Sequence, residues 1–352
     1  MPELLPFLKS LISVPGLSGH EASVRKLIEE AWHPLADEVS VSRLGSLHAL
    51  KRGNTPAPRP SLLLAAHMDA IGLMVTAIEG DFLRLTEIGG VDARVLPGQP
   101  VIVHGREALP GIVVQPPPRL LPQEYEKDPV PLKYLLVDTG LETEQLKELV
   151  RVGDGISFAQ PPLELKGETL AGHTLDNRVS VAALTECLGQ LQGRSHVWDV
   201  WAVATVQEEE TMGGALTSAF DLHPQLAIAV DVTHAKGPGS PEHKTYPLGK
   251  GPTLGWGPNV HPALHKTFKE LANRLEIPYS LEVMPRHSGT DAYGMQIALE
   301  GIPTMVIGLP LRYMHTPVEV VSLKDVQRAG RLLAEFVVGL AVNFAEKLVW
   351  DN

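Results

Sequence analysis

The stretch SLLLAAHMD, residues 61–69, is an almost wholly apolar run that ends in two polar side chains, His67 and Asp69. A short apolar run without alternation is typical of a strand buried on both faces of a sheet. Apolar residues at helical spacing precede it at 3–13 and 20–33, and strand and helix patterns alternate again in the second half of the chain. The sequence therefore predicts an α/β domain with a mixed sheet, in which His67 and Asp69 lie at the carboxyl edge of a strand.

The pattern changes between residues 71 and 164. Short alternating apolar segments broken by Gly and Pro fill this region, which is typical of a small β-barrel or sandwich. We therefore expect a discontinuous α/β domain, residues 1–70 and 165–352, interrupted by a β domain at 71–164. Within the α/β domain, a strand is expected through 197–207 and a last helix over about 322–346.

The composition excludes several classes of protein. Lys and Arg total 30 against 41 Asp and Glu, for a net charge of −11, so we expect no general electrostatic binding of nucleic acid. No run approaches the length of a membrane span and no signal peptide pattern is present, so we expect a cytoplasmic protein without membrane contact. Cys187 is the single cysteine, which excludes an intrachain disulfide and a cysteine-based zinc site.

Several short segments place acids or imidazoles where a predicted strand ends or a helix begins. They are His67 to Asp69, Asp176, Glu208 to Glu210, Asp231 and His315. Ligands of an open α/β sheet lie outside the carboxyl ends of its strands, so these segments are expected to converge there. Histidines and carboxylates without cysteine suit Zn²⁺, Co²⁺ or Mn²⁺. The H-E-x-x-H motif of many single-zinc enzymes is absent, whereas scattered ligands around one shared carboxylate are what a metal pair requires.

Six motifs follow one another along the chain: AAHMDAIGLMV, TLDNRVSVAAL, ATVQEEETMGGA, AVDVTHA, SGTDAY and YMHTPVEV. Together they resemble the M42 family of metallo-aminopeptidases, the TET type that also includes glutamyl aminopeptidase-like and cellulase-M-like proteins. PGLSGHE near the start and GGVDARVLPGQPVIVHG in the insert resemble the family too, so the match covers nearly the whole chain.

The resemblance implies a three-layer α/β metallopeptidase domain with an inserted β-barrel that serves dimerisation. It implies a cytosolic enzyme that removes residues from peptide N-termini with two divalent metal ions per subunit, Zn²⁺ or Co²⁺ first and Mn²⁺ as a further candidate. It also implies a homo-oligomer built from dimers, often a hollow dodecamer.

The resemblance assigns the metal ligands position by position. Asp176 would bridge the two metals. His67 and Asp231 would complete one metal site, and Glu209 and His315 would complete the other.

The remaining site residues are assigned in the same way. Glu208 would be the general base that activates a metal-bridging water, and Asp69 would fix the tautomer of the neighbouring ligand imidazole. Glu210 and Asp291 are expected at the substrate. The family usually continues after its two glutamates with a Val-Gly-Leu-Arg-Gly type sequence, whereas this chain has Glu-Thr-Met-Gly-Gly at 210–214. The added carboxylate and the missing arginine bear on substrate preference and on metal affinity. Glu210 and the acidic balance of the chain are compatible with a basic N-terminal side chain.

Two other functions compete with this interpretation. A dimetal N-acyl amino acid deacylase or carboxypeptidase of the M20/M28 kind would use similar ligands, but the insert with its VLPGQPV segment argues against it. A binding protein that has lost its metals is disfavoured because all five ligands and the base are present. His173, His234 and His287 are expected outside the ligand set, and Cys187 in the core.

Overall fold

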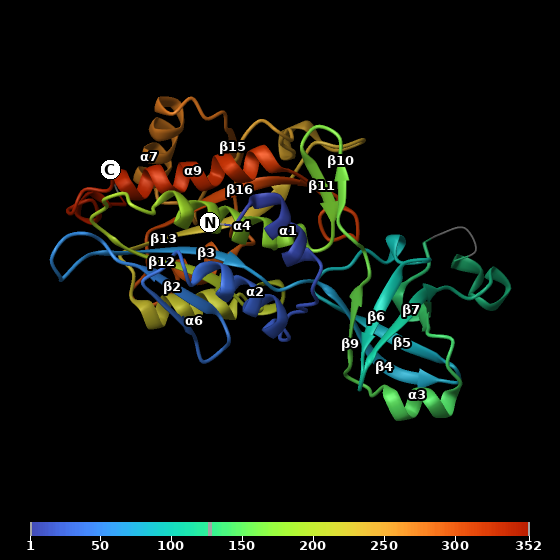
Figure 1. The fold of residues 1–352 in the computed structure, drawn as a ribbon. Coiled ribbons are helices and arrows are strands. Elements are labelled where there is room, and N and C mark those ends of the chain that lie inside the picture. The colour runs from blue at the N-terminus through green and yellow to red at the C-terminus, as the bar shows by residue number, and fades with distance from the viewer. Residues whose placement is uncertain (1, 126–128, 351–352) are drawn as a thin grey trace.

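The computed structural model describes residues 2–125 and 129–350, which form two bodies that lie side by side (Figure 1). The larger is an α/β body and the smaller is a closed barrel. Each has its own cluster of buried apolar side chains, and the cluster of the barrel draws only on residues 71–158. The expected α/β fold with an inserted small barrel is confirmed.

Within the described residues, the α/β body contains an 11-stranded mixed sheet in the order β1-β2-β12-β3-β13-β16-β17-β11-β10, with β14 and β15 attached beside β16. Its strands are β1 (Glu38–Val41), β2 (Leu47–Lys51), β3 (Ser61–His67), β10 (Leu163–Leu165), β11 (Thr169–Gly172), β12 (Asp199–Thr205), β13 (Leu226–His234), β14 (Thr253–Trp256), β15 (Ser280–Val283), β16 (Thr304–Arg312) and β17 (Glu319–Ser322). The four central strands β12, β3, β13 and β16 are parallel, so their carboxyl ends meet at one edge.

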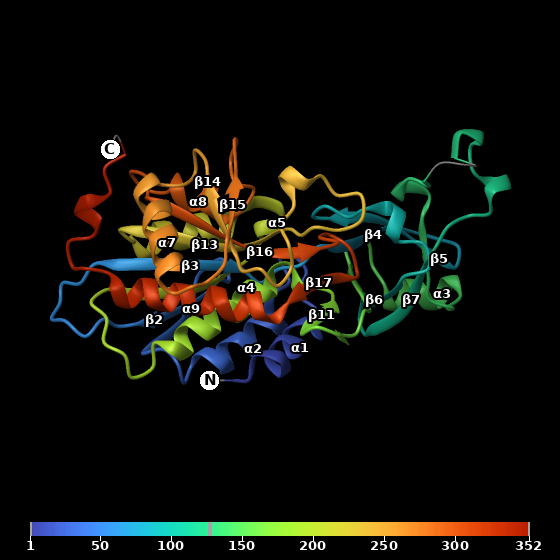
Figure 2. The ribbon, with the colours of Figure 1, turned by 90° about the horizontal axis from the view of Figure 1, so that it is seen from above.

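Helices cover both faces of this sheet. Figure 2 shows α4 and α9 on one side, together with α1 and α2, and α8 on the other side. The helices are α1 (Leu4–Ile12), α2 (Ala22–Trp32), α4 (Leu175–Gln190), α5 (Glu208–Thr211), α6 (Gly213–Leu222), α7 (Pro262–Arg274), α8 (Asp291–Gln296) and α9 (Leu323–Gly339). Helix α4 is buried along residues 175–188 because it lies between the sheet and other helices. Among the described residues, no helix has both the length and the apolar composition that crossing a bilayer demands.

The barrel closes in the order β4-β5-β8-β7-β6-β9, with every pair antiparallel. Its elements are β4 (Gly72–Glu79), β5 (Phe82–Ile88), β6 (Pro100–His104), β7 (Ala108–Val114), β8 (Leu136–Asp138), α3 (Thr143–Leu149) and β9 (Gly155–Phe158). Alternating side chains such as Leu83 and Leu85 point into the barrel, which is the period that identified this region as β structure.

Two predicted elements end earlier than the sequence indicated. The strand through 197–207 ends at Thr205, because Gln207 adopts a left-handed conformation with φ 56° and a one-turn helix follows. The last helix ends at Gly339 instead of about residue 346. The apolar residues that prolonged its helical pattern pack outside the helix: Ala341 accepts a hydrogen bond from Trp198 Nε1, and Phe344 packs edge-on against the same indole. The predicted helices at 3–13 and 20–33 are confirmed.

Candidate metal centre

The carboxyl ends of the central strands surround a cavity of about 190 Å³. Six of the residues that line it are those predicted to hold or use metal: His67, Asp176, Glu208, Glu209, Asp231 and His315. They come from β3, the start of α4, α5, β13 and the turn after β16. Parallel register explains this convergence: His67 pairs with Thr205 of β12, three residues before Glu208, and Asp231 lies on the next strand.

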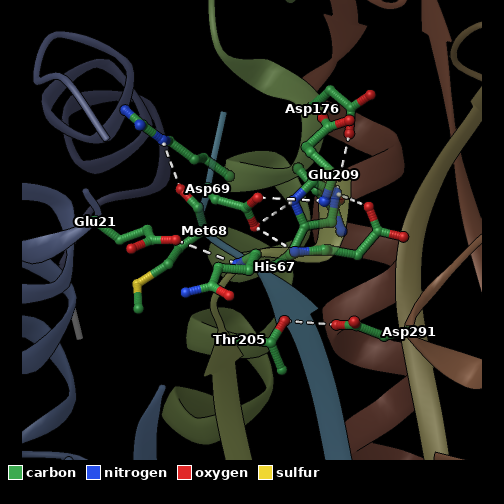
Figure 3. A network of polar contacts seen from close by, with 12 residues as sticks. Glu21, His67, Met68, Asp69, Asp176, Thr205, Glu209 and Asp291 are labelled. Carbon is green, nitrogen blue, oxygen red and sulfur yellow. Dashed lines mark hydrogen bonds and ion pairs between the residues drawn. The ribbon is translucent and has the colours of Figure 1, made fainter. Parts of the chain in front are cut away.

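Asp176 lies beside His67 and Glu209 in the cluster (Figure 3). Its Oδ1 is 3.3 Å from His67 Nε2, and its Oδ2 is 3.5 Å from His315 Nε2. The backbone at Asp176 has φ −77° and ψ 104°, outside the helical region although it lies in the first turn of α4. This conformation turns the carboxylate toward the ends of the strands, with one oxygen facing each imidazole.

Each imidazole has a further acid beside it. His67 Nε2 is 3.7 Å from Asp231 Oδ1 and 3.7 Å from Glu208 Oε2, and His315 Nε2 is 3.6 Å from Glu209 Oε2. These separations exceed a normal hydrogen bond. They lie at or just beyond the spacing of about 3.3–3.6 Å between two ligands that are each about 2.0–2.2 Å from a tetrahedral metal. Ligand atoms of His67, Asp176 and Glu209 all lie within 4.8 Å of one another.

The electrostatics of the cluster also fit divalent cations. Burial, together with neighbouring carboxylates, raises the pKa of Glu208, Glu209 and Asp231 well above the usual range, although His67 opposes the effect. Burial lowers the pKa of His67, but the surrounding acids, Glu208 foremost, raise it by more. Within the described chain, Glu209 Oε1 is buried without a hydrogen-bond partner. Concentrated buried acids are costly unless they are paired or coordinate a metal, so the donor set fits a metal pair.

Asp69 holds the two neighbouring glutamates in place. Its carboxylate accepts hydrogen bonds from the backbone N–H groups of Glu208 (3.0 Å) and Glu209 (3.3 Å), and its Oδ1 lies 3.4 Å from His67 Nδ1. Glu21 supports the same turn, because its Oε1 accepts hydrogen bonds from the N–H groups of Gln207 and Gly19 (Figure 3). The two glutamates lie in the short helix α5, and both line the cavity.

Glu319 is a site residue that the sequence reasoning missed. It is fully buried at the start of β17 and pairs with Gly172 of β11, so it lies between the segments that lead to the two ligands. Its carboxylate accepts hydrogen bonds from the N–H groups of Leu175 (2.7 Å), Asp176 (3.1 Å) and His315 (3.2 Å). An acid between valines, four residues after His315, was the only signal in the sequence.

Arg178 was also missed. It is 1% exposed and donates hydrogen bonds to the backbone carbonyls of Met68 (3.2 Å), Leu11 (2.5 Å) and Val14 (2.7 Å). Burial lowers the pKa of this guanidinium to about 10, although nearby acids, Asp69 first, oppose the shift. The side chain therefore ties α1 and the segment after β3 to the helix that carries Asp176.

The barrel contributes one turn to the site. A Cβ at Gly90 would lie 3.0 Å from His315 Nδ1, and one at Gly89 would lie 3.4 Å from Glu209 Cβ, so this turn passes close to both side chains. The N–H of Gly89 donates to Glu210 Oε1 at 2.6 Å. Glu210 thus contacts the turn and is not among the residues that line the cavity.

Asp291 lies behind the cavity and does not line it. It is 2% exposed, and its Oδ2 accepts a hydrogen bond of 2.5 Å from Thr205 Oγ1 (Figure 3). Burial raises the pKa of Asp291 to about 6. Of the three histidines expected outside the ligand set, only His234 lines the cavity; His173 and His287 do not. Cys187 is buried in the core, as expected.

Comparisons with known proteins show the family to which the chain is similar. The profile of the M42 glutamyl aminopeptidase family matches residues 45–332. The lysyl aminopeptidase of Pyrococcus furiosus is 36% identical over 331 residues, which cover 92% of this chain and 94% of that protein. A TET aminopeptidase from a marine sediment archaeon of the Thaumarchaeota has a TM-score of 0.93 at 32% identity, covering 98% of this chain and 99% of the other. The TET1 peptidase of Pyrococcus horikoshii, which can assemble into a tetrahedron or a large octahedral shell, has a TM-score of 0.84 at 29% identity, covering 96% and 100% of the two chains.

Proposed function

This chain belongs to the M42 glutamyl aminopeptidase family, a family of peptidases, and from that premise we propose that it is an aminopeptidase with two divalent metal ions and Glu208 as its general base. The observation that carries the proposal is the placement of Asp176. One of its oxygens faces His67 at 3.3 Å and the other faces His315 at 3.5 Å, as a carboxylate shared by two metals requires.

The proposed ligand sets follow from the nearest neighbours of each imidazole. Asp231 would join His67 at the first metal, and Glu209 would join His315 at the second. Zn²⁺ and Co²⁺ are the first candidates and Mn²⁺ the next, since imidazole and carboxylate ligands accept all three. The bound ions would supply Lewis acidity toward the scissile carbonyl and lower the pKa of the attacking water.

Glu208 would carry the proton in this reaction. Its carboxylate lies in the cavity 3.7 Å from the imidazole of His67, and its backbone is fixed by Asp69. The water adds to the carbonyl carbon as Glu208 takes its proton, and the same proton then passes to the leaving nitrogen as the C–N bond breaks. One of the two metal ions could also receive the free amine of the substrate, which would restrict the enzyme to peptide N-termini.

The test combines metal content with activity. Wild-type protein treated with a chelator and reloaded with Zn²⁺ or Co²⁺ is expected to hold two metal equivalents per subunit and to hydrolyse aminoacyl p-nitroanilides. Glu208→Gln is expected to keep both metals and to lose about 10²- to 10⁴-fold in kcat. Full activity in this variant would refute the assigned base.

The same assay addresses the alternative substrates. The M20/M28-type deacylase or carboxypeptidase is not favoured, because the relatives found are named aminopeptidases. Cleavage of N-acetylated peptides only, with free N-termini left intact, would restore that alternative.

We further propose that residues 1–70 and 165–352 form the catalytic unit and that residues 71–164 form a dimerisation domain within a homo-oligomer of the dodecamer type. Exposed apolar side chains support self-association. On the barrel, Phe82 and Ile112 flank the same residue of β8, and on the α/β body Phe220 and Ile297 are 62% and 56% exposed. A cytoplasmic location stays a prediction.

Light scattering on the purified protein tests the assembly. A mass near that of 12 subunits, and a smaller mass for Ile112→Glu, are the expected results. A monomer in the wild type would overturn the proposed assembly without bearing on the metal site.

A further inference from the structure

Glu282 is an acid in the catalytic cavity that the mechanism above does not use. It lies on β15, the strand that pairs only with β14 among the described residues, and it lines the same cavity as the proposed ligands. Its two oxygens have separate hydroxyl donors: Thr233 Oγ1 donates to Oε1 at 2.6 Å, and Thr253 Oγ1 donates to Oε2 at 2.5 Å.

Three further strands shape the position of this carboxylate. Thr233 comes from β13, Thr253 from β14, and Gly308 from β16. A Cβ at Gly308 would lie 2.8 Å from Glu282 Oε2 and 2.2 Å from Thr253 Oγ1, so only glycine leaves room for the pair. The carboxylate therefore fits into a space that residues of these three strands define.

The two threonine hydroxyls donate to this carboxylate, but neither carries a charge that would balance it. No lysine or arginine is among the described residues that line the cavity. A carboxylate has about four acceptor positions, and the two threonines occupy only one on each oxygen. Burial raises the pKa of Glu282, although the two hydroxyls lower it in part. A cation that binds beside such a partly buried acid would stabilise its charged form.

The position of Glu282 relative to the ligands suggests the source of that cation. Thr233, its hydrogen-bond donor, lies two residues after Asp231 on β13, so both side chains face the cavity about 7 Å apart along the strand. The charge of a lysine side chain lies at the end of a four-carbon stem of comparable length. Met284 and Met314 also line the cavity and offer flexible apolar surface to such a stem.

We propose that Glu282 selects peptides whose N-terminal residue is lysine or arginine, by pairing with the charge at the end of its side chain. The inference rests on the proposed aminopeptidase function, because it assigns the first substrate residue to this cavity. The basic side chain of the substrate is thereby assigned to Glu282. Glu210, the other candidate for this role, contacts the Gly89 turn instead.

The test compares lysyl and norleucyl p-nitroanilides, which share a four-carbon stem and differ in the ammonium group. The metal-loaded wild type is expected to give a kcat/KM about 10- to 100-fold higher for lysine, the range of a hydrogen bond to a charged group. In Glu282→Gln this ratio is expected to fall to about one, with kcat/KM for norleucine retained. Glu210→Gln is the matched comparison, and its lysine-to-norleucine ratio is expected to stay at the wild-type value.

A second variant keeps the inference testable if Glu282→Gln does not fold. Glu282→Asp withdraws the carboxylate by one methylene, so it is expected to shift preference from lysine toward the longer arginine. A wild-type ratio of about one, or an unchanged ratio in both Glu282 variants, would overturn the inference while leaving the aminopeptidase function intact. If the lysine-to-norleucine ratio fell to about one in Glu210→Gln alone, Glu210 and not Glu282 would be the residue that recognises the basic side chain. No hydrolysis of either substrate by metal-loaded wild type would instead remove the proposed function, and this inference with it.

Discussion

The barrel and the α/β body differ in where they place charged side chains. The relevant part of the α/β body is the edge at which its central parallel strands end. Some acids of the barrel form ion pairs at the surface, as Glu79 does with Arg84 Nε at 2.7 Å and Glu144 with Lys147 Nζ at 2.9 Å. Among the described residues, none of the buried polar or charged side chains comes from the barrel, residues 72–158. The α/β body, in contrast, buries Asp69, Asp176, Glu208, Asp231 and Glu319 close together.

The difference separates charged side chains that remain in solvent from those that the proposed metal centre would use or hold in place. Exposed ion pairs such as those of the barrel contribute little to stability, and its core is apolar. Buried acids that outnumber their basic partners destabilise the metal-free protein, so a cation that binds at this edge would account for their concentration there. Substitutions in the two regions should therefore differ sharply in effect.

The largest effect is expected for Asp176→Asn. Loss of one shared anionic oxygen should reduce metal content below two per subunit, and kcat/KM should fall about 10³-fold or more, since metal ions supply several kcal/mol of transition-state stabilisation. Mass spectrometry of bound metal and steady-state kinetics measure both. Two retained equivalents with normal activity would show that Asp176 is not the shared ligand.

A smaller effect is expected for Glu319→Gln. The amide would present N–H groups to backbone N–H donors, which leaves buried groups unpaired and lowers the free energy of unfolding by about 1–3 kcal/mol. Because Glu319 holds the backbone of Asp176 and His315, metal affinity should also fall about 10- to 100-fold. Urea unfolding measures the free energy of unfolding, and competition with a chelator measures the metal affinity. Weaker stability with unchanged metal affinity would limit Glu319 to a folding role.

Metal binding at the acid cluster of the α/β body, which has no counterpart in the described part of the barrel, should depend on pH. The raised pKa values of Glu208, Glu209, Asp231 and His67 mean that the metal-free site keeps protons that ordinary carboxylates would have lost near neutral pH. Metal must displace them, so affinity is expected to fall as the pH decreases, by about tenfold per pH unit for each proton released. Calorimetry in two buffers with different ionisation enthalpies counts these protons. Binding without proton release at about pH 7 would contradict the raised pKa values.

The smallest effect is expected on the barrel. Glu79→Gln removes an exposed ion pair with Arg84, and neither the melting temperature nor kcat/KM should change measurably. The variant also serves as the barrel control for Asp176→Asn. A large loss of activity would show that the barrel surface acts on the site, for instance through an oligomer contact.

Much of the fold and the candidate ligands could be predicted because their signals are local. The apolar run before His67, the helical spacing of 20–33 and the alternation within 71–164 each report a burial pattern that a few neighbouring residues determine. The polar residues at strand ends were visible for the same reason. Predictions failed where local patterns were ambiguous: the apolar residues after Gly339 read as helix, yet they pack as irregular chain against Trp198.

The tertiary structure alone decided which acids face one another and what they hold. Glu319 and Asp176 are 143 residues apart, and strand pairing brings the carboxylate to that backbone N–H. Glu210 follows the two proposed site glutamates in sequence but reaches a turn of the barrel, whereas Glu282, which no motif marked, lies in the cavity because Gly308 leaves it room. The sequence by itself determined the residue types and their periodicity; the register of strands distant in the chain determined their neighbours, and no local pattern encodes that register.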